Sequence, residues 1–182
     1  MKVLLDANIV ITYISKRDDK YQEDIERIIR LCQEERLECY IAFHTLSIAW
    51  YTMRKIPNQT LRESLFAFCG IVDLASAEMN SVRGALSNTA FRDFEDNLQD
   101  CCARSVGADC IVTANVRDYE GRSAVKAVTP SELLSILNAT DDSYTAPDSS
   151  LEVREQFVEY NATQNVIPVR PHLHIMAYPT AC

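Results

Sequence analysis

The chain begins Met1-Lys2-Val3-Leu4-Leu5-Asp6-Ala7-Asn8, and this stretch indicates both a fold class and a place for a functional site. Its apolar residues predict a short buried strand that delivers Asp6 to its carboxyl end. In open parallel sheets ligands bind at that end, so we interpret Asp6 as a candidate functional residue. The interpretation depends on whether other acidic residues reach the same edge from distant parts of the chain.

Short apolar strands alternate with amphipathic helices along most of the sequence. The predicted strands are 3–6, 39–42, 71–75, 110–113 and 125–128. The predicted helices are 18–36, 44–55, 58–68, 77–87, 92–106 and 130–137. Strands that alternate with helices of this length predict an α/β fold, with a parallel sheet of about five strands covered on both faces.

The composition favours one domain of moderate size followed by an extension. The chain has 182 residues, and 47% of them are hydrophobic, which is ample for a core. Residues 138–150 are rich in Asp, Ser, Thr, Ala and Pro, as is typical of a linker. We therefore predict a compact domain at 1–138. Residues 139–182 would form a linker and a C-terminal extension with one short helix at 151–160, otherwise extended or disordered.

Charge and cysteine content bear on the partners and the compartment. The formal net charge is −8 and no basic block occurs, so the electrostatic footprint of a sequence-reading nucleic-acid binder is missing. A cluster of catalytic acids would bias this sum, so the charge does not exclude RNA as a substrate. Seven cysteines without a CxxC pair predict free, buried thiols in a reducing compartment. No stretch reaches membrane-spanning length and no leader is visible, so we expect a cytoplasmic protein without a membrane partner.

A second acidic stretch, residues 92–100, is predicted to be helical. On this helix Asp93, Asp96 and Asp100 fall on one stripe. Asp96 lies in the first turn, where a helix that follows the sheet edge would point it inward, so we interpret it as functional. Asp93 is either a helix cap or part of the site. For Asp100 we favour a solvated position, paired with Arg104 four residues later.

A third polar stretch follows the fourth predicted strand. It places Thr113, Asn115 and Asp118 at the carboxyl end of that strand. Taken alone, these residues would suit turn chemistry, because Asn and Asp satisfy tight loops by bonding to their own backbone. Taken with Asp6 and Asp96, oxygen-bearing side chains from three elements converge on one edge of one sheet.

Converging carboxylates of this kind suit a divalent metal ion. Mg²⁺ and Mn²⁺ prefer hard oxygen ligands and keep several waters, so a few carboxylates and substrate phosphate oxygens complete the shell. Such an ion lowers the pKa of a bound water and stabilises charge on a scissile phosphate. The sequence has no GxSxG nucleophile motif and no glycine-rich phosphate loop. A receiver-like phosphotransferase also uses acids at strand ends, but no lysine at the end of a late strand supports that alternative.

The chain resembles the PIN domain family. The resemblance rests on Leu4-Leu5-Asp6-Ala7-Asn8, Asp93-Phe94-Glu95-Asp96-Asn97-Leu98-Gln99 and Ile111-Val112-Thr113-Ala114-Asn115-Val116-Arg117-Asp118-Tyr119, in this order and spacing. The bacterial branch of VapC-type toxins is the most similar. The resemblance implies a three-layer α/β/α sandwich and an endoribonuclease that depends on Mg²⁺ or Mn²⁺. It also implies frequent homodimers and, in toxin members, neutralisation by a cognate antitoxin.

The resemblance also assigns roles by position. Asp6 matches the first metal-binding acid of the family and Asp96 the third, while Asn115 lies where many members place a fourth acid. Asp118, just beyond it, is a replacement for that acid. The predicted metal ligands are Asp6, Asp96, Asp118 and Asn115, the three acids being catalytic. The predicted residues around them are Asn8, Thr113 and Asp93.

The resemblance fails at the second acid of the family. That acid aligns with Ile48, and no Asp or Glu occurs from residue 39 to residue 62. Helical periodicity places Ile48 opposite the apolar stripe, beside His44, at a position where a polar residue is expected. Two hypotheses follow: a ribonuclease whose remaining acids hold the ion through waters, or a degenerate PIN domain that binds RNA or protein without cutting. His44 is either a substitute ligand or general base, or a structural residue.

Overall fold

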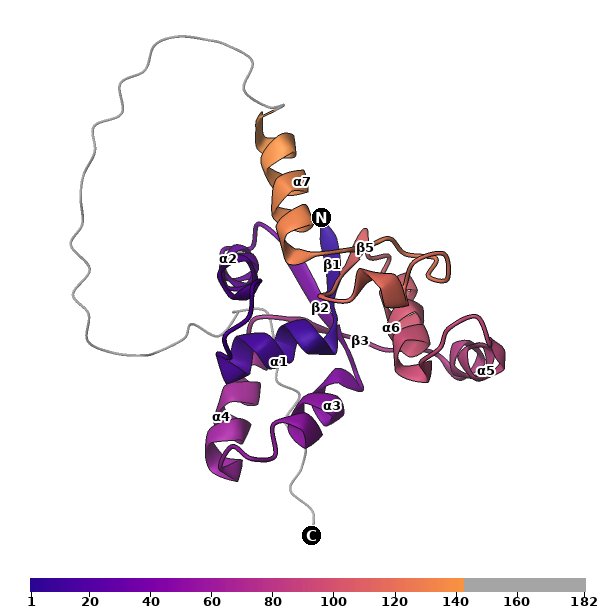
Figure 1. Ribbon diagram of the computed structural model, residues 1–182, viewed down its shortest axis with the longest axis horizontal. Coiled ribbons are helices and arrows are strands. Elements are labelled where there is room, and N and C mark those ends of the chain that lie inside the picture. Colours follow the sequence, from indigo (N-terminus) through magenta and orange to yellow (C-terminus); the bar gives the residue numbers. More distant parts are fainter. Residues whose placement is uncertain (143–182) are drawn as a thin grey trace, which may run out of the picture. The chain divides into compact units, whose positions relative to one another are not determined.

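The computed structural model describes residues 1–142, which form a parallel sheet with helices on both of its faces (Figure 1). The strands are β1 (Lys2–Leu5), β2 (Glu38–Ala42), β3 (Asp73–Ala75), β4 (Cys110–Val112) and β5 (Ala127–Val128). The helices are α1 (Ala7–Ser15), α2 (Gln22–Gln33), α3 (Thr45–Thr52), α4 (Asn58–Cys69), α5 (Met79–Ser87), α6 (Phe94–Ser105) and α7 (Pro130–Asp142), with a short 3₁₀ helix at Val116–Asp118. All strand pairs are parallel, in the order β3-β2-β1-β4-β5.

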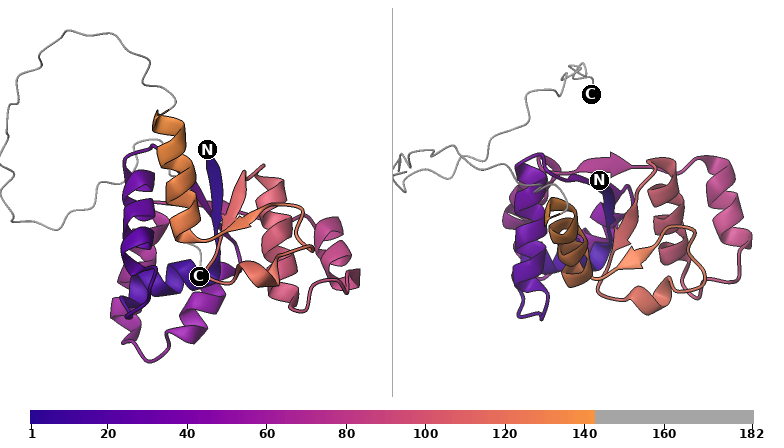
Figure 2. Two further views of the ribbon diagram at one scale, coloured as in Figure 1. Left: turned by 45° about the horizontal axis from the view of Figure 1, so that its top comes forward. Right: turned by 90° about the horizontal axis from the view of Figure 1, so that it is seen from above.

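The helices lie in two layers, one on each face of the sheet (Figure 2). Val3 and Leu5 of β1 belong to a core that they share with α1, α2, α4 and α7. Leu4 points the other way, because successive side chains of a strand alternate between faces, and it packs in a second core with α6. Helix α5 packs on α6. The predicted α/β/α sandwich with a five-stranded parallel sheet is therefore confirmed.

The strand order brings two of the predicted motifs to adjacent positions. Strand β1 is central, between β2 and β4, and its register pairs Leu5 with Val112. The residues that follow these two, Asp6 and Thr113, consequently leave the sheet side by side, and the amide of Asp6 still donates to the carbonyl of Val112 at 3.0 Å. Residues at the carboxyl ends of parallel strands thus meet as the sequence predicts.

The largest differences from the expected elements concern three helices. Helix α1 follows Asp6 directly, although no helix was predicted there, and α2 is shorter than the predicted helix 18–36. Helix α7 continues to Asp142, beyond the predicted end at 137. The predicted linker and extension, with the helix at 151–160, lie almost entirely outside the described residues, so the domain boundary at 138 stays a prediction.

The prediction that all cysteines are free thiols is wrong for two of them. Cys32 near the end of α2 and Cys39 in β2 form a disulfide, with Cα atoms 6.0 Å apart. Only a short turn separates this helix from this strand, and both side chains point into the same core, which brings the two sulfurs together. Cys69, Cys101, Cys102 and Cys110 are free, and Cys182 lies outside the described residues.

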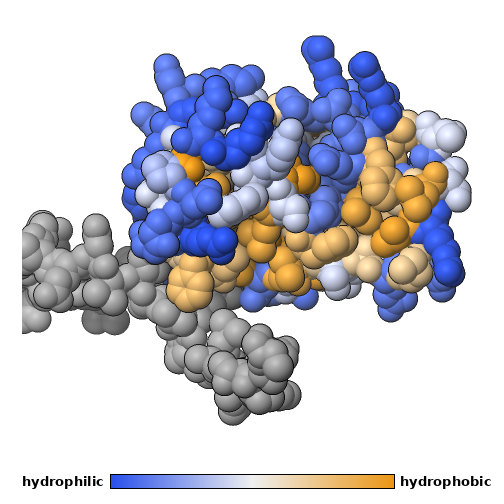
Figure 3. All heavy atoms as spheres, turned by 90° about the horizontal axis from the view of Figure 1, so that it is seen from below, coloured by the Kyte–Doolittle hydropathy of each residue, from blue (hydrophilic) through white to orange (hydrophobic). Residues whose placement is uncertain are grey.

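Several large apolar side chains remain exposed on the helices that follow β2 and β3. Tyr51 of α3, Phe66 of α4 and Leu86 of α5 are each more than 60% exposed. Figure 3 shows hydrophobic residues gathered in a band on the face that it displays, between hydrophilic regions. No helix within residues 1–142 is long and apolar enough to cross a membrane.

Candidate functional site

Asp6 is the most deeply buried carboxylate of the site. Its side chain is only 6% exposed, and both of its oxygens accept hydrogen bonds. Oδ2 accepts from the side-chain amide of Asn8 at 2.7 Å and from the hydroxyl of Thr113 at 2.7 Å. Oδ1 accepts from the side-chain amide of Gln99 at 3.1 Å. Burial raises the pKa of Asp6 above its ordinary value, and the hydrogen bond from Thr113 opposes part of that increase.

Asn8 and Thr113 also bind each other, so the end of β1 and the end of β4 form one network. The Asn8 amide donates to Oγ1 of Thr113 at 3.0 Å, and its Oδ1 accepts from the backbone of Ala114 at 3.1 Å. Oγ1 of Thr113 further accepts from the backbone of Asn115 at 3.0 Å. This network fixes the Asp6 carboxylate from two strands at once, which is the arrangement that orients a ligating carboxylate.

Asp96 enters the site from the first turn of α6 and is partly buried. Burial, together with the negative charges of Asp6, Asp93 and Asp118, raises the pKa of Asp96 to about 7. Asp93 is the N-cap of α6, where its carboxylate accepts from the backbone of Glu95 at 2.9 Å. Asp93 was expected to be either a helix cap or part of the site. The structure shows the contact of a helix cap.

Asp118 and Asn115 lie on the loop that joins β4 to β5. Both are exposed; Asp118 ends the 3₁₀ helix, and its charge acts on Asp96. The carbonyl of Asn115 accepts from the backbone of Asp118 at 3.1 Å, so the two residues belong to one turn. The structure therefore brings Asp118 near Asp96 while leaving its side chain open to solvent.

Two residues of the site had no assigned role in the sequence. Gln99 is 1% exposed and reaches Asp6 from α6, three residues after Asp96 on the same helical face. Tyr119 is 2% exposed, and its ring packs edge-on against Phe91 at 6.4 Å between ring centroids. Within residues 1–142 its hydroxyl is buried without a hydrogen bond of regular geometry, but burial and the charges of Asp6 and Asp96 raise the pKa of Tyr119. Helical spacing from Asp96 could have identified Gln99, whereas nothing in the sequence marks Tyr119.

The expected solvated position of Asp100 is wrong. Asp100 does pair with Arg104, whose Nε donates to Oδ2 at 3.0 Å, but the Asp100 side chain is only 4% exposed. The other oxygen, Oδ1, accepts from the hydroxyl of Ser123 at 2.5 Å and from the backbone of Ala124 at 3.0 Å and Val125 at 3.2 Å. The loop before β5 covers this part of α6, and the sequence did not indicate that contact.

The donor set fits a hard divalent cation that keeps part of its water shell. In residues 1–142, no lysine or arginine forms an ion pair with Asp6, Asp96 or Asp118, so their negative charge is not neutralised by the chain. Within the same range, no three His, Cys, Asp or Glu side chains lie tightly enough to enclose an ion by themselves. Asp6 is buried, whereas Asp96 is partly exposed and Asp118 is exposed. Carboxylates that repel one another and leave room for water are suited to Mg²⁺ or Mn²⁺, which is bound by few protein oxygens.

A family profile described as "PIN domain" matches residues 2–117, which include the first two acidic motifs and the third motif as far as Arg117. The chain belongs to the PIN domain family. Among solved structures, it is similar to VapBC2 from Rickettsia felis bound to a DNA fragment from the promoter, with a TM-score of 0.54 and 18% sequence identity. The similarity covers 71% of this chain and 98% of that chain, and at this identity it supports the fold alone. No curated protein matches the chain in sequence.

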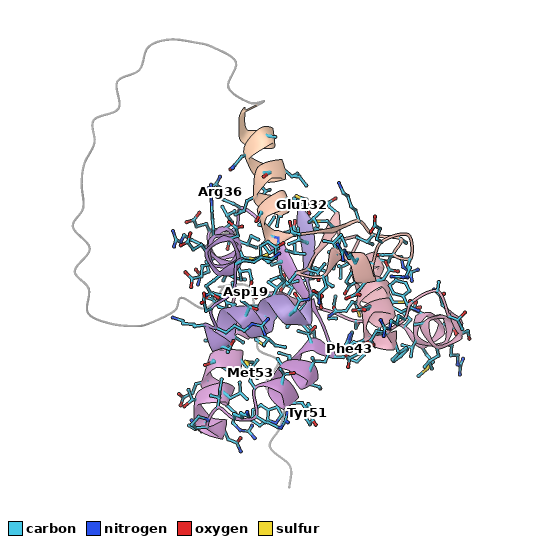
Figure 4. All side chains as sticks on the ribbon, in the orientation of Figure 1. Asp19, Arg36, Phe43, Tyr51, Met53 and Glu132 are labelled. Carbon is cyan, nitrogen blue, oxygen red and sulfur yellow. A yellow bond between two sulfur atoms is a disulfide. The ribbon has the colours of Figure 1, made fainter. Side chains whose placement is uncertain are left out.

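This PIN domain uses position 48, where an acid was expected, for packing. Ile48 is partly buried and packs against a small apolar cluster that contains Ile11 of α1 and Ala49 of α3. The expectation that this side of α3 is polar is therefore wrong at Ile48. On the same helix and just after it, Tyr51 is exposed and Met53 is buried (Figure 4).

His44 lies at the N-cap position of α3 in this PIN domain and follows Phe43, which Figure 4 labels. The two rings pack edge-on at 5.1 Å, and both ring nitrogens are buried without a regular hydrogen bond in the described part of the chain. Burial lowers the pKa of His44, which favours the neutral ring. These contacts favour a structural, packed role for the His44 ring over a role as a metal ligand or general base.

Proposed function

We propose that this PIN domain is a metal-dependent endoribonuclease of the VapC type, which hydrolyses RNA phosphodiester bonds. The observation that supports the proposal most is the Asp6 carboxylate, which is buried, held by Asn8, Thr113 and Gln99, and without a cationic partner among residues 1–142. Burying a carboxylate is costly unless hydrogen bonds or a cation compensate for lost water. A surface that holds such a group beside Asp96 is suited to binding a cation.

In this proposal each residue has a defined task. Asp6, Asp96 and Asp118 hold Mg²⁺ or Mn²⁺, and Asn115 contributes a neutral oxygen or orients a water. Asn8, Thr113 and Gln99 keep the Asp6 carboxylate in a fixed orientation. A bound ion of this kind supplies a water of lowered pKa and stabilises negative charge on the phosphate. The exposed side of Asp118 leaves room for the RNA backbone, whose phosphate oxygens complete the coordination.

The similarity to a VapBC structure suggests a partner. That structure is described as a VapBC2 complex bound to promoter DNA. We propose that this chain is the toxin of a toxin–antitoxin pair in the cytoplasm, with a small antitoxin as its protein partner and a homodimer as its assembly. Co-expression with the product of a neighbouring small reading frame tests this part, because loss of growth inhibition requires a specific complex. A chain that never inhibits growth would argue against the toxin assignment without affecting the nuclease assignment.

RNA cleavage tests the activity directly. Purified protein is incubated with a mixed RNA substrate and Mg²⁺ or Mn²⁺, and products are compared with those of Asp6→Asn. The matched control is Asp18→Asn, which removes the same charge from an exposed residue outside the site. We expect cleavage by the wild type and by the control only. Cleavage that persists in Asp6→Asn would show that the site is wrongly assigned.

A PIN domain that binds without cutting is the second candidate, and Ile48 favours it. An apolar residue at this position removes one negative charge from the site and is committed to packing. Calorimetric titration with Mn²⁺ separates the candidates. Saturable binding that is lost in Asp96→Asn supports the ribonuclease. Absence of saturable binding in the wild type, together with absent cleavage, supports the non-cutting domain.

A further inference from the structure

Helix α6 carries two aspartates one turn apart, and they have different surroundings. Asp96 lies near the carboxylates of Asp6 and Asp118, whereas Asp100 contacts the loop before β5. The two oxygens of Asp100 have separate partners: Oδ2 accepts from Arg104 on the same helix, and Oδ1 accepts three hydrogen bonds from residues 123–125. Hydrogen bonds to an ionised acceptor are about twice as strong as neutral ones, so Oδ1 is a firm anchor.

The loop that Asp100 anchors carries Asp118. Residues 113–125 lead from β4 to β5, and the first of them, Thr113, is fixed by its bond to Asp6. In the middle of the loop, Tyr119 is buried in the core that α6 shares with the sheet. At the far end, Ser123 and the two residues after it are held by Asp100. Asn115 and Asp118 lie between these attachment points and are exposed.

We propose that Asp100 is a positioning residue for the metal site: it ties residues 123–125 to α6 and thereby sets the place of Asp118 relative to Asp96. The proposal rests on the function proposed above. Because Asp96 and Asp100 belong to one helix, an anchor on Asp100 also fixes the loop with respect to Asp96. In the absence of a cation the carboxylates of Asp96 and Asp118 repel each other. The loop that carries Asp118 therefore needs an attachment that keeps it close to Asp96.

A role in stability alone would give the same contacts, so the experiment must separate the hydrogen bonds of Asp100 to the loop from its ion pair with Arg104. Asp100→Ala removes both. Arg104→Gln removes only the ion pair within α6, from a side chain that is half exposed, and is the matched control. Asp100→Asn keeps one oxygen that can still accept from residues 123–125 and is the conservative rescue. Ser123→Ala removes one loop donor and replaces Asp100→Ala if that variant does not fold.

The primary measurement is Mn²⁺ affinity by calorimetry, with thermal unfolding in chelator recorded for each variant. We expect Asp100→Ala to weaken Mn²⁺ binding by about 10-fold, as is typical when a residue that orients metal ligands is lost. Arg104→Gln should retain the wild-type affinity within about 2-fold, and Asp100→Asn should recover most of the loss. In an Asp118→Asn background, Asp100→Ala should have little further effect, because the ligand that it positions is already missing.

Three results would overturn the proposal when the wild type binds Mn²⁺. The first is equal weakening by Arg104→Gln, and the second is the full effect of Asp100→Ala in the Asp118→Asn background. The third is a lower unfolding temperature of Asp100→Ala with unchanged Mn²⁺ affinity, which would reduce Asp100 to a structural role. If the wild type binds no Mn²⁺, the function proposed above fails, and amide hydrogen exchange of metal-free protein decides the positioning. Faster exchange at residues 115–120 in Asp100→Ala but not in Arg104→Gln supports it, and equal exchange overturns it.

Discussion

Replacing Asp96 by asparagine should stabilise the metal-free protein at high pH, although the residue is proposed to be essential for activity. The folded protein raises the pKa of Asp96 from 3.8 to about 7. A carboxyl group whose pKa is higher in the folded state binds its proton more tightly there than in the unfolded chain. Stability is therefore greatest below about pH 4 with respect to this group, and it decreases as the pH rises from about 4 to about 7.

The size of the effect follows from the shift. A difference of about 3 pKa units corresponds to about 4 kcal/mol at full burial. Asp96 is partly exposed, so solvent screening reduces this to about 2 kcal/mol. Asparagine has nearly the same shape and no charge, so Asp96→Asn should raise the free energy of unfolding by about 2 kcal/mol at about pH 8. At about pH 5 Asp96 is protonated in the folded protein but ionised in the unfolded chain, so the increase should be smaller, about 0.8 kcal/mol.

Denaturant unfolding in chelator at the two pH values measures this difference, and the exposed substitution Asp18→Asn serves as the control. Adding Mn²⁺ at about pH 8 should stabilise the wild type by an amount that grows with the logarithm of the Mn²⁺ concentration above its Kd, and it should leave Asp96→Asn unchanged. The reasoning is refuted if Asp96→Asn lowers the free energy of unfolding at about pH 8. It is also refuted if the gain is the same at both pH values, because the effect would then not arise from ionisation.

Three further substitutions probe the surroundings of the carboxylates. Thr113→Val keeps the shape but removes a donor to Asp6, so the free energy of unfolding should fall by about 2 kcal/mol in denaturant titration, and an unchanged value would contradict the hydrogen bond. Tyr119→Phe removes a hydroxyl that lowers the pKa of Asp96, so carboxyl-carbon NMR should show this pKa rising, whereas a fall would exclude the interaction. Ile48→Glu should lower the unfolding free energy by about 2 kcal/mol, because it places a charge in an apolar cluster, yet tighten Mn²⁺ binding in calorimetry. Weaker Mn²⁺ binding by Ile48→Glu would place residue 48 outside the site.

The sheet and its carboxyl edge could be predicted because they depend on local pattern. Val3, Leu4 and Leu5 are buried on both faces of the sheet, as a continuous apolar run in a parallel strand predicts. Helix α1 was not predicted, because Ile9, Val10, Ile11 and Thr12 are β-branched and disfavour a helix when considered alone. Packing of this helix into the core of β1 decides its structure, and that contact is not local in sequence.

The contacts of the site could be predicted only in part, and the reason is again distance along the chain. Asp6, Asn8 and Thr113 follow adjacent strands, so their proximity follows from the predicted topology. The Asp100 anchor joins residues 100 and 123–125 through a loop whose path depends on tertiary packing. The Cys32–Cys39 disulfide was missed for a different reason: the count and spacing of cysteines carry no information on which side chains point into one core.

The apolar residue at position 48 and the raised pKa of Asp96 both affect the pH at which the proposed site would bind a metal ion. Divalent ions bind the ionised carboxylate, so in the proposed metal site protons would compete with the metal at Asp96 until the pH exceeds about 7. A further acid beside the site would add like charge and raise that pKa more, which shifts metal binding to still higher pH. With Ile48 the site has fewer ligands, but those it has ionise at lower pH than they would beside another carboxylate. Mn²⁺ affinity measured against pH should therefore rise through about pH 7 in the wild type and at higher pH in Ile48→Glu. Coincident pH profiles would show that residue 48 does not act on Asp96.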